Sequence, residues 1–510
     1  MSLAGIFKKG EGISLAGAEP YFDCQGKLNL VYDGQLYNAS ELKGKLAAEH
    51  NFTTEASGEV VIHLLEEHYQ GDLEAALKSI LRLLDGAYAM AATQGEEIIL
   101  LRDPIGTKPL YYVADSQCIA FASEKKALWQ AGFGEVKPLR AGMLAKFDTQ
   151  GLEIHKALPL SEMGIEIRIK DLSLAIESYN KALYSAVRKR LADVNRVGVL
   201  VSGGVDSCLL AKLAQEIAAE RGIEVIAYSA GSADSSDLEY AEDFTKSMGL
   251  KHKVNRLDLN KVEAYLPKVI QAVEERDFIQ IEAGIGIYAA TEMASQDGIG
   301  VIFSGQGPDE LWGGYVWYPK VVEEGGYTGL LEREWDDLAR ADIETLDREN
   351  KIALSLGMEA RFPYVDLEVV KLAMSVSPEL KVSSAEDNLG KHPHRELAKR
   401  LGVLPHFADR TKDATQHGTG VHQMLEEIAR RNGFTPELVE GIGYYSEKVT
   451  TEKLGSSARY GYRYAEDKSL WLIPAHIQLF FDVMAYRSGI LNGMERGKIE
   501  GFIEGIDPYL

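Results

Sequence analysis

The sequence contains one short string whose residue types suit phosphate binding, Ser202-Gly203-Gly204-Val205-Asp206-Ser207, directly after an apolar run that ends at Val201. Adjacent glycines let a backbone approach an anion closely, and a helix that begins here presents its first N–H groups and its positive dipole end. The hydroxyls of Ser202 and Ser207 can donate further hydrogen bonds, and the Asp206 carboxylate suits a Mg²⁺ ion held against phosphate oxygens. The alternative is a Gly-rich strand–helix turn without a ligand, which the full six-residue string disfavours.

A second Gly-rich string carries two adjacent carboxylates. It reads Ser304-Gly305-Gln306-Gly307-Pro308-Asp309-Glu310 and again follows an apolar segment, which ends at Phe303. Open α/β sheets bind ligands at the carboxyl ends of their parallel strands, so both strings are expected to face one site. Asp309 would then share Mg²⁺ with Asp206, since a leaving pyrophosphate needs its charge neutralised. The alternative for this string is a solvated turn.

These two strings need strands and helices that hold them at one edge of a sheet. Beyond about residue 171, apolar strand-like runs alternate with helical periodicity, which predicts parallel βαβ units. Strands are expected at Val197–Val201, Glu224–Ser229 and Gly300–Phe303, and helices at Leu172–Leu191, Cys208–Arg221 and Leu238–Met248.

Residues 1–150 are instead predicted to be β-rich, with short segments. Expected strands are Leu28–Tyr32, closed by an Asp33-Gly34 turn, and the pairs Gly86–Ala92 with Ile98–Leu101 and Leu110–Val113 with Cys118–Ala122; expected helices are Ser40–His50 and Gly58–His68. A polar stretch around Leu160–Asp171 is the best first boundary. We therefore expect domains at 1–158 and 172–428, followed by a helical extension at 429–510.

The composition is that of an acidic globular protein. The 510 residues carry a formal net charge of −22 and 45% of them are apolar, and the length predicts two or three domains. The acidity argues against a nucleic-acid or anionic-membrane surface, although a small cationic pocket for a nucleotide is compatible with it. The three cysteines are far apart, which predicts neither a disulfide framework nor a CxxC metal site and favours a cytoplasmic location. No apolar run is long enough to span a membrane.

The phosphate-binding string resembles the pyrophosphate loop of ATP pyrophosphatases, enzymes that cleave ATP between the α and β phosphates to adenylate a substrate. The second string, extended to Tyr315, resembles the SGEGxDE-(hydrophobic)₂-GGY signature of asparagine synthetases, and further similar stretches follow in the family's order at 348–366, 391–396 and 410–418. To about residue 425 the sequence thus resembles glutamine-dependent asparagine synthetases of class B. The resemblance implies an α/β protein with an N-terminal Ntn-hydrolase-like αββα sandwich and a doubly wound parallel-sheet ATP-pyrophosphatase domain, which has the adenine nucleotide alpha hydrolase-like fold.

The resemblance also assigns residues to ATP, Mg²⁺ and catalysis. ATP contacts are expected from Val201, Ser202, Gly203, Gly204, Asp206, Ser207, Ser229, Ala230, Ser304 and Gly305, and Mg²⁺ ligation from Asp206 and Asp309. Catalytic roles are expected for Asp309, Gln306 and Lys412. The positive charge of Lys412 would interact with the phosphates while the adenylate forms. Gln306 stands where the family usually has a glutamate thought to steer or deprotonate the amine. An amide at this position could orient ammonia but could not accept its proton.

Substrate contacts are expected from Glu310, Glu359 and Arg361, because Arg suits bidentate carboxylate binding. For Glu359 and Arg361 a structural ion pair is the alternative. His392 and His394 lie two residues apart in a predicted helix, which puts them on different faces, so we interpret them as surface residues and not as metal ligands.

The first domain resembles the glutaminase domain of this family, in which a terminal cysteine attacks glutamine. Ala4-Gly5-Ile6-Phe7 matches the family's Cys-Gly-Ile-Phe, so the nucleophile position is an alanine. Asp33-Gly34 replaces the Asn-Gly pair of the oxyanion hole, and Ser57-Gly58 replaces the acid that holds the glutamine amine. The string that grips the glutamine carboxylate is also missing ahead of Asp33. Together these changes indicate a glutaminase without activity.

The predicted function is ATP-dependent amide synthesis through an acyl-adenylate, with release of AMP and pyrophosphate. The expected reaction converts aspartate to asparagine with ammonia instead of glutamine. One alternative is a related ligase acting on another carboxylic acid, as in β-lactam-forming relatives, and another is a non-catalytic nucleotide-binding homologue. A tRNA-modifying ATP pyrophosphatase is disfavoured by the net charge and by the glutaminase-like domain. Expected partners are ATP, Mg²⁺, a small amino or carboxylic acid and ammonia, but no nucleic acid and no membrane; a homodimer is left open.

Overall fold

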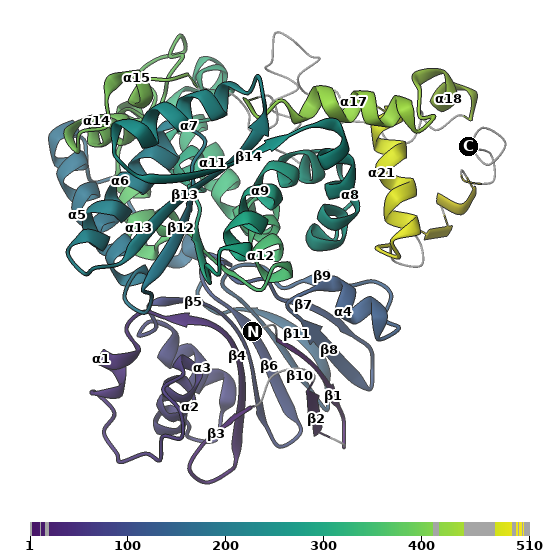
Figure 1. Cartoon of the computed structure of the whole chain (residues 1–510). Helices are drawn as coiled ribbons and strands as arrows, with labels where there is room; N and C mark the ends of the chain where they lie inside the picture. The colour runs from purple at the N-terminus through teal and green to yellow at the C-terminus, as the bar shows by residue number, and fades with distance from the viewer. Residues whose placement is uncertain are drawn as a thin grey trace. The chain divides into compact units, whose positions relative to one another are not determined.

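Figure 1 shows the computed structural model of the chain, which describes residues 3–10, 12–15, 20–411, 418–442, 475–491, 496–497, 499–501 and 503. The chain divides into two compact units, Met1–Ile165 and Glu166–Leu510. Among the described residues, no helix combines the length and the apolar character that crossing a membrane requires.

The first unit contains two antiparallel sheets built from its short apolar segments. The six-stranded sheet has the order β11-β10-β6-β5-β4-β3, and the five-stranded sheet has the order β2-β1-β8-β7-β9. The strands are β1 Ala4–Lys8, β2 Gly12–Leu15, β3 Tyr21–Phe22, β4 Leu28–Leu36, β5 Gly86–Gln94, β6 Glu97–Arg102, β7 Tyr111–Ala114, β8 Cys118–Ala122, β9 Lys137–Pro138, β10 Met143–Asp148 and β11 Gly151–Lys156.

Four layers make up this unit, in the order helices, sheet, sheet, helix. Side chains of both sheets, among them Phe7, Val31 and Phe147, form the apolar core between them. Helices α2 (Ser57–His68) and α3 (Leu73–Leu81) cover the outer face of the six-stranded sheet, and α4 (Lys125–Gln130) covers that of the five-stranded sheet. The predicted αββα sandwich is confirmed.

The turn predicted at Asp33-Gly34 was wrong, because both residues lie inside β4. Asp33 pairs with Ala89 and Gly34 with Tyr88 of the neighbouring strand β5. Glycine is required here because a Cβ at position 34 would lie 2.2 Å from the carbonyl oxygen of Ala87. The dipeptide therefore permits a close approach of two strands and does not reverse the chain.

The helix predicted at Ser40–His50 is much shorter, since α1 spans only Ala39–Lys43. After it, the backbone N–H groups of Ala47 and Ala48 donate to the Glu67 carboxylate, at 2.7 and 2.8 Å. A side chain of α2 thus replaces the intrahelical acceptors that a longer helix would have supplied, and His50 lies in the connection between α1 and α2.

The second unit is built around a parallel five-stranded sheet of order β14-β13-β12-β15-β16. Its strands are β12 Arg196–Leu200, β13 Glu224–Ser232, β14 Lys251–Leu257, β15 Val301–Phe303 and β16 Glu359–Arg361. The chain adds β13 and β14 on one side of β12 and then β15 and β16 on the other. Right-handed crossovers put the helices of these two halves on opposite faces. The doubly wound sheet is confirmed, although β14 and β16 were missed in the sequence.

The described helices of this unit are α5 Leu172–Arg190, α6 Val205–Ala219, α7 Ser236–Ser247, α8 Leu259–Val273, α9 Phe278–Gln296, α10 Pro308–Trp312, α11 Tyr318–Glu344, α12 Leu346–Ser355, α13 Leu367–Ser375, α14 His392–Arg400, α15 Pro405–Ala408, α17 Val421–Arg431, α18 Pro436–Gly441 and α21 Ala475–Arg487. The three helices predicted with bounds correspond to α5, α6 and α7 and differ from them by a few residues at most. The reversal of strand order lies between β12 and β15, which is where ligands bind in sheets of this kind.

Candidate active site

The phosphate-binding string forms a tight loop between β12 and the N-terminus of α6. The backbone N–H of Ser202 donates to Ser207 Oγ at 3.1 Å, and that hydroxyl donates to the Gly204 carbonyl at 3.0 Å. Gly203 has φ +74°, and a Cβ there would lie 2.4 Å from Tyr240 Cβ, so only glycine fits. The first turn of α6 therefore directs its N–H groups at the space beyond the strand end.

A pocket lies at the carboxyl ends of β12, β13 and β15. Its empty space, including the open mouth, is about 1170 Å³. The predicted residues that line it are Val201, Ser202, Gly204, Asp206, Ser207, Ser229, Ala230, Ser304, Gly305, Gln306 and Asp309. The two strings, about a hundred residues apart in sequence, thus meet at the switch point of the sheet, as the parallel topology requires. Lys412 lies outside the described residues.

The Lys391 ammonium joins the two strings. Its Nζ donates to both carboxylate oxygens of Asp206, at 2.9 and 2.7 Å, and lies 2.8 Å from Asp309 Oδ1. Burial alone would lower the pKa of Lys391, but the Asp206 and Asp309 charges outweigh it and raise the pKa. Gly314 makes room for this arrangement, since a Cβ there would lie 1.9 Å from Lys391 Cε.

The positions of the Asp206 and Asp309 carboxylates show whether the residues of this site fit the implied Mg²⁺ ion. Because both contact one ammonium nitrogen, their oxygens converge on a small region beside the phosphate-binding loop. Carboxylate oxygens are the ligands that Mg²⁺ prefers, and the ion also binds phosphate oxygens. The residues present therefore fit the ion, which Asp206 and Asp309 would hold.

The interpretation of His394 as a surface residue was wrong. The side chain is fully buried, its Nε2 lies 3.1 Å from Asp206 Oδ1, and its Nδ1 lies 2.8 Å from the Tyr179 hydroxyl. Burial lowers the pKa of His394 despite the neighbouring Asp206. His394, which is outside the pocket lining, contacts Asp206 and so fixes its position. His392, in contrast, is partly exposed and pairs with Asp387 at 2.6 Å.

Two arginines without a predicted role also line the pocket. Arg410 donates to the Ser202 carbonyl at 3.1 Å and to Asp237 at 2.8 Å, and its guanidinium lies 4.1 Å from the centre of the Tyr240 ring. Arg395 is buried and donates to the carbonyls of Ala408 and Arg410, at 2.6 and 2.9 Å. These contacts fix the segment after α15 against the phosphate-binding loop.

A carboxylate that sequence reasoning missed lies beside Gln306. Gln306 Nε2 donates to Glu349 Oε1 at 2.6 Å, and Glu349 lines the pocket although only 4% of it is exposed. Burial raises the pKa of Glu349, while the charge of Arg348 and hydrogen bonds from Ser304 and Gln306 act in the opposite direction. No motif spacing could have joined these two residues, which belong to different elements of the fold.

The three residues expected to bind substrate lie outside the lining of this pocket. Arg361 makes a bidentate ion pair with Asp193, at 2.6 and 2.8 Å, and contacts Glu359 at 3.0 Å. The structural ion pair, the alternative for these two residues, is the arrangement found. Glu310 is buried and accepts a hydrogen bond from the Tyr315 hydroxyl at 2.7 Å.

In the first unit, the position matched to the glutaminase nucleophile lies inside a strand. Ala4 pairs with Ala122 of β8, and its nitrogen is in a peptide bond with the buried Leu3. Ser123 Oγ accepts from the Leu3 N–H at 2.9 Å and donates to Asp33 Oδ2 at 2.8 Å. A methyl group cannot act as a nucleophile, and Asp33 accepts a hydrogen bond where the family's asparagine would donate one.

The position of the missing acid is filled by an aromatic ring. A Cβ at Gly58 would lie 2.2 Å from Tyr21 Cε2.

Restoring an acid with Gly58→Asp is expected to lower the free energy of unfolding by about 1–2 kcal/mol, since the Tyr21 ring must move. It should not create glutamine hydrolysis. Thermal unfolding and glutamate release would be measured, with Gly134→Asp as the control, because nothing lies within 4 Å of a Cβ at Gly134. Equal melting temperatures for the two variants would contradict this account.

Comparison with known proteins agrees with this geometry. The asparagine synthase family model matches residues 178–342 and 323–482, and a glutamine amidotransferase domain model matches residues 13–130. A putative asparagine synthetase [glutamine-hydrolyzing] 1 of Methanocaldococcus jannaschii is 32% identical over 482 residues, covering 86% of this chain and 86% of the relative. Asparagine synthetase [glutamine-hydrolyzing] 2 of Oryza sativa is 28% identical over 72% of this chain and 61% of its own length.

Among solved structures, one titled as the allosteric regulatory enzyme of purine biosynthesis aligns with 46% of this chain and 60% of its own, at 20% identity and a TM-score of 0.27. The family matches cover most of the chain and include the pocket at the switch point. The chain therefore belongs to the asparagine synthase family and is a carbon–nitrogen ligase of that family.

Proposed function

We propose that the protein converts aspartate, ATP and ammonia to asparagine, AMP and pyrophosphate through an aspartyl-adenylate. ATP-dependent amidation is the activity of the family. The observation that supports this reaction here is the convergence of the phosphate-binding loop, the Asp206 and Asp309 carboxylates and the Lys391 ammonium on one pocket.

In the first half-reaction, the loop and the N-terminus of α6 bind the ATP phosphates, and the aspartate carboxylate attacks the α-phosphorus. Mg²⁺, held by Asp206 and Asp309, would supply charge neutralisation of the leaving pyrophosphate. Lys391 keeps the two acidic side chains together despite their mutual repulsion. Lys412 is proposed from its motif as a further cation for the phosphates.

In the second half-reaction, ammonia attacks the acyl carbon, AMP leaves, and the nitrogen loses a proton. Gln306 would orient ammonia through its amide oxygen, and Glu349 would accept the proton. The Gln306–Glu349 hydrogen bond of 2.6 Å supports this division of roles, because it brings a carboxylate to the position where the neutral Gln306 has none.

The nitrogen source is the sharpest test of this proposal. With ATP, Mg²⁺ and aspartate, ammonium is expected to support formation of asparagine and AMP, whereas glutamine alone should give less than about a hundredth of that rate, since the residue at the nucleophile position is Ala4. Asparagine, glutamate and pyrophosphate would be quantified separately. Equal rates with both nitrogen sources would contradict the inactive glutaminase.

The alternatives give different results in the same assay. A ligase for another acid would release pyrophosphate with that acid and ammonia but not with aspartate. A non-catalytic homologue would bind ATP and release no pyrophosphate with any acid tested.

A further inference from the structure

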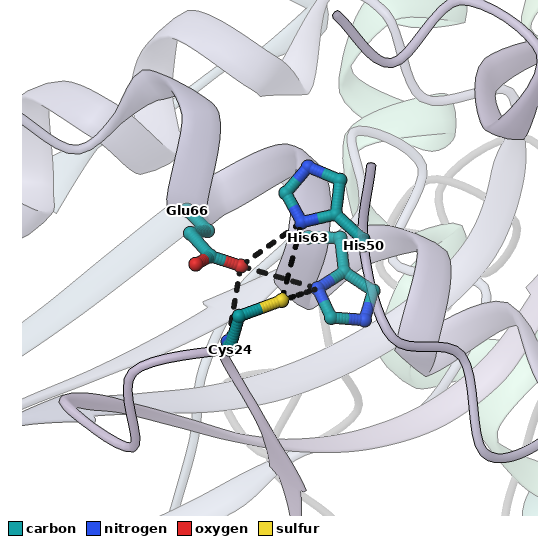
Figure 2. Close-up of side chains that lie close together, drawn as sticks. All are labelled: Cys24, His50, His63 and Glu66. Carbon is teal, nitrogen blue, oxygen red and sulfur yellow. Dashed lines mark hydrogen bonds and ion pairs between the residues drawn. The ribbon is translucent and has the colours of Figure 1, made fainter. Parts of the chain in front are cut away.

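Four side chains with metal-binding atoms meet in the first unit, and none of them is a residue matched to the glutaminase site. Figure 2 shows Cys24, His50, His63 and Glu66 pointing toward one another. Cys24 lies in the turn between β3 and β4, His50 in the connection after α1, and His63 and Glu66 about one turn apart on α2. Three separate segments of the chain thus contribute to one cluster.

Four distances between these atoms are close to the edge lengths of a coordination tetrahedron. Zinc bonds of about 2.3 Å to sulfur and about 2.0–2.1 Å to nitrogen and oxygen give tetrahedral edges of about 3.5 Å for S···N and about 3.3 Å for N···O. Cys24 Sγ lies 3.5 Å from His50 Nδ1 and 3.8 Å from His63 Nδ1. Glu66 Oε2 lies 3.2 Å from each of these two nitrogens. Four of the six distances between the ligand atoms are thus close to the edges of a zinc tetrahedron, and all four atoms lie within 4.8 Å of one another.

The contacts of the two ring nitrogens of His50 also favour a metal. Its Nε2 lies 3.1 Å from Glu67 Oε1, which requires a proton on Nε2. The same ring presents Nδ1 to Cys24 Sγ and Glu66 Oε2, two of the other ligand atoms of the cluster. With a metal, Nδ1 is an unprotonated ligand and Nε2–H donates to Glu67, the usual arrangement of metal-bound histidines.

The outer carboxylate is itself held in place. Glu67 Oε1 accepts the backbone N–H groups of Ala47 and Ala48, and the Cys24 N–H donates to Glu66 Oε2 at 3.1 Å. The side chains of His50 and His63 are 4% and 2% exposed, so the nitrogen ligands are shielded from water. The cluster is thus preorganised on its buried side and is reached by solvent through Cys24.

We propose that Cys24, His50, His63 and Glu66 bind a structural Zn²⁺ ion. One thiolate, two imidazoles and one carboxylate form a closed four-ligand set, which is typical of structural sites and leaves no position for a substrate. The ion would fasten the β3–β4 turn and the connection after α1 to helix α2. This link would stabilise the segment between α1 and α2, which forms no helix or strand of its own. The site is independent of the ligase reaction.

The test uses the purified full chain and measures its zinc content after exchange into metal-free buffer. Wild type and Cys118→Ser are expected to retain about one Zn²⁺ per chain, and Cys24→Ser and His50→Gln less than about a tenth of that. Cys118 is the matched control because it is a free cysteine of the same unit on β8. Circular dichroism would verify that each variant is folded.

Cobalt gives a second measurement. Adding Co²⁺ to the chelator-treated chain should produce tetrahedral ligand-field bands and a thiolate-to-cobalt charge-transfer band, the latter absent in Cys24→Ser. A wild-type chain that takes up neither metal would overturn the proposal, as would equal zinc content in Cys24→Ser.

Discussion

Asp206→Asn is expected to reduce ATP-dependent pyrophosphate release by about 10³-fold, equivalent to about 4 kcal/mol of transition-state stabilisation. The carboxylate accepts two hydrogen bonds from Lys391, contacts His394 and is a proposed Mg²⁺ ligand. An amide retains the shape but loses the charge that pairs with the buried ammonium, and it is a poor Mg²⁺ ligand. Release of pyrophosphate from ATP in the presence of aspartate and ammonium would be followed under saturating Mg²⁺.

The matched control is Glu216→Gln, which removes a carboxylate from the same helix, α6, where Glu216 is exposed and pairs with Lys212 at 2.7 Å. This variant should release pyrophosphate at the wild-type rate. Because breaking a buried ion pair also costs stability, thermal unfolding of Asp206→Asn must be measured in parallel. A folded Asp206→Asn protein within about tenfold of the wild-type rate would contradict the assignment of Asp206 to the reaction.

The second large effect is expected for Glu349→Gln, and it should separate the two half-reactions. Adenylation does not use this carboxylate, so exchange of labelled pyrophosphate into ATP, dependent on aspartate, should stay within a few-fold of wild type. Formation of asparagine should fall by about 10²–10⁴-fold, the usual contribution of a general base. A merely structural role for Glu349 would lower both rates together.

The pH profile adds an independent signature. Burial raises the pKa of Glu349, and a base acts only when deprotonated. Amide formation in the wild type should therefore increase with pH through that raised pKa, and this acidic limb should disappear in Glu349→Gln. The control is Glu344→Gln at the end of α11, whose carboxylate pairs with Arg340 at 3.2 Å and is partly exposed. An unchanged acidic limb in Glu349→Gln would assign the titration to another group.

Local sequence was sufficient for the two loops of the ligase pocket. An apolar run followed by Ser-Gly-Gly and a helical pattern can fold in few ways, because glycine at positive φ and a helix start are local requirements, and Gly203 has φ +74°. The meeting of Asp206 with Asp309 was also predictable, since parallel strands bring their carboxyl ends to one edge.

Lys391 and His394 show where local reasoning stops. The spacing of His392 and His394 correctly indicates different faces of a helix, but it does not tell which face another element covers. Helix α14 lies against α5 and the phosphate-binding loop, which buries His394 beside Tyr179 and Asp206. Burial at this position is therefore a property of the packing of three distant segments.

The sequence by itself determined the family, the two types of sheet and the loops that face ATP, because these depend on periodicity, glycine and strand–helix order within short windows. Only the tertiary structure decided which polar and charged side chains meet: Glu349 with Gln306, Lys391 with two aspartates, and Cys24 with His50, His63 and Glu66. Apart from His63 and Glu66, which lie three residues apart on α2, these contacts join residues 16 to 185 positions apart. Side-chain contacts over such separations follow from the packing of whole elements, which no single window of the sequence contains.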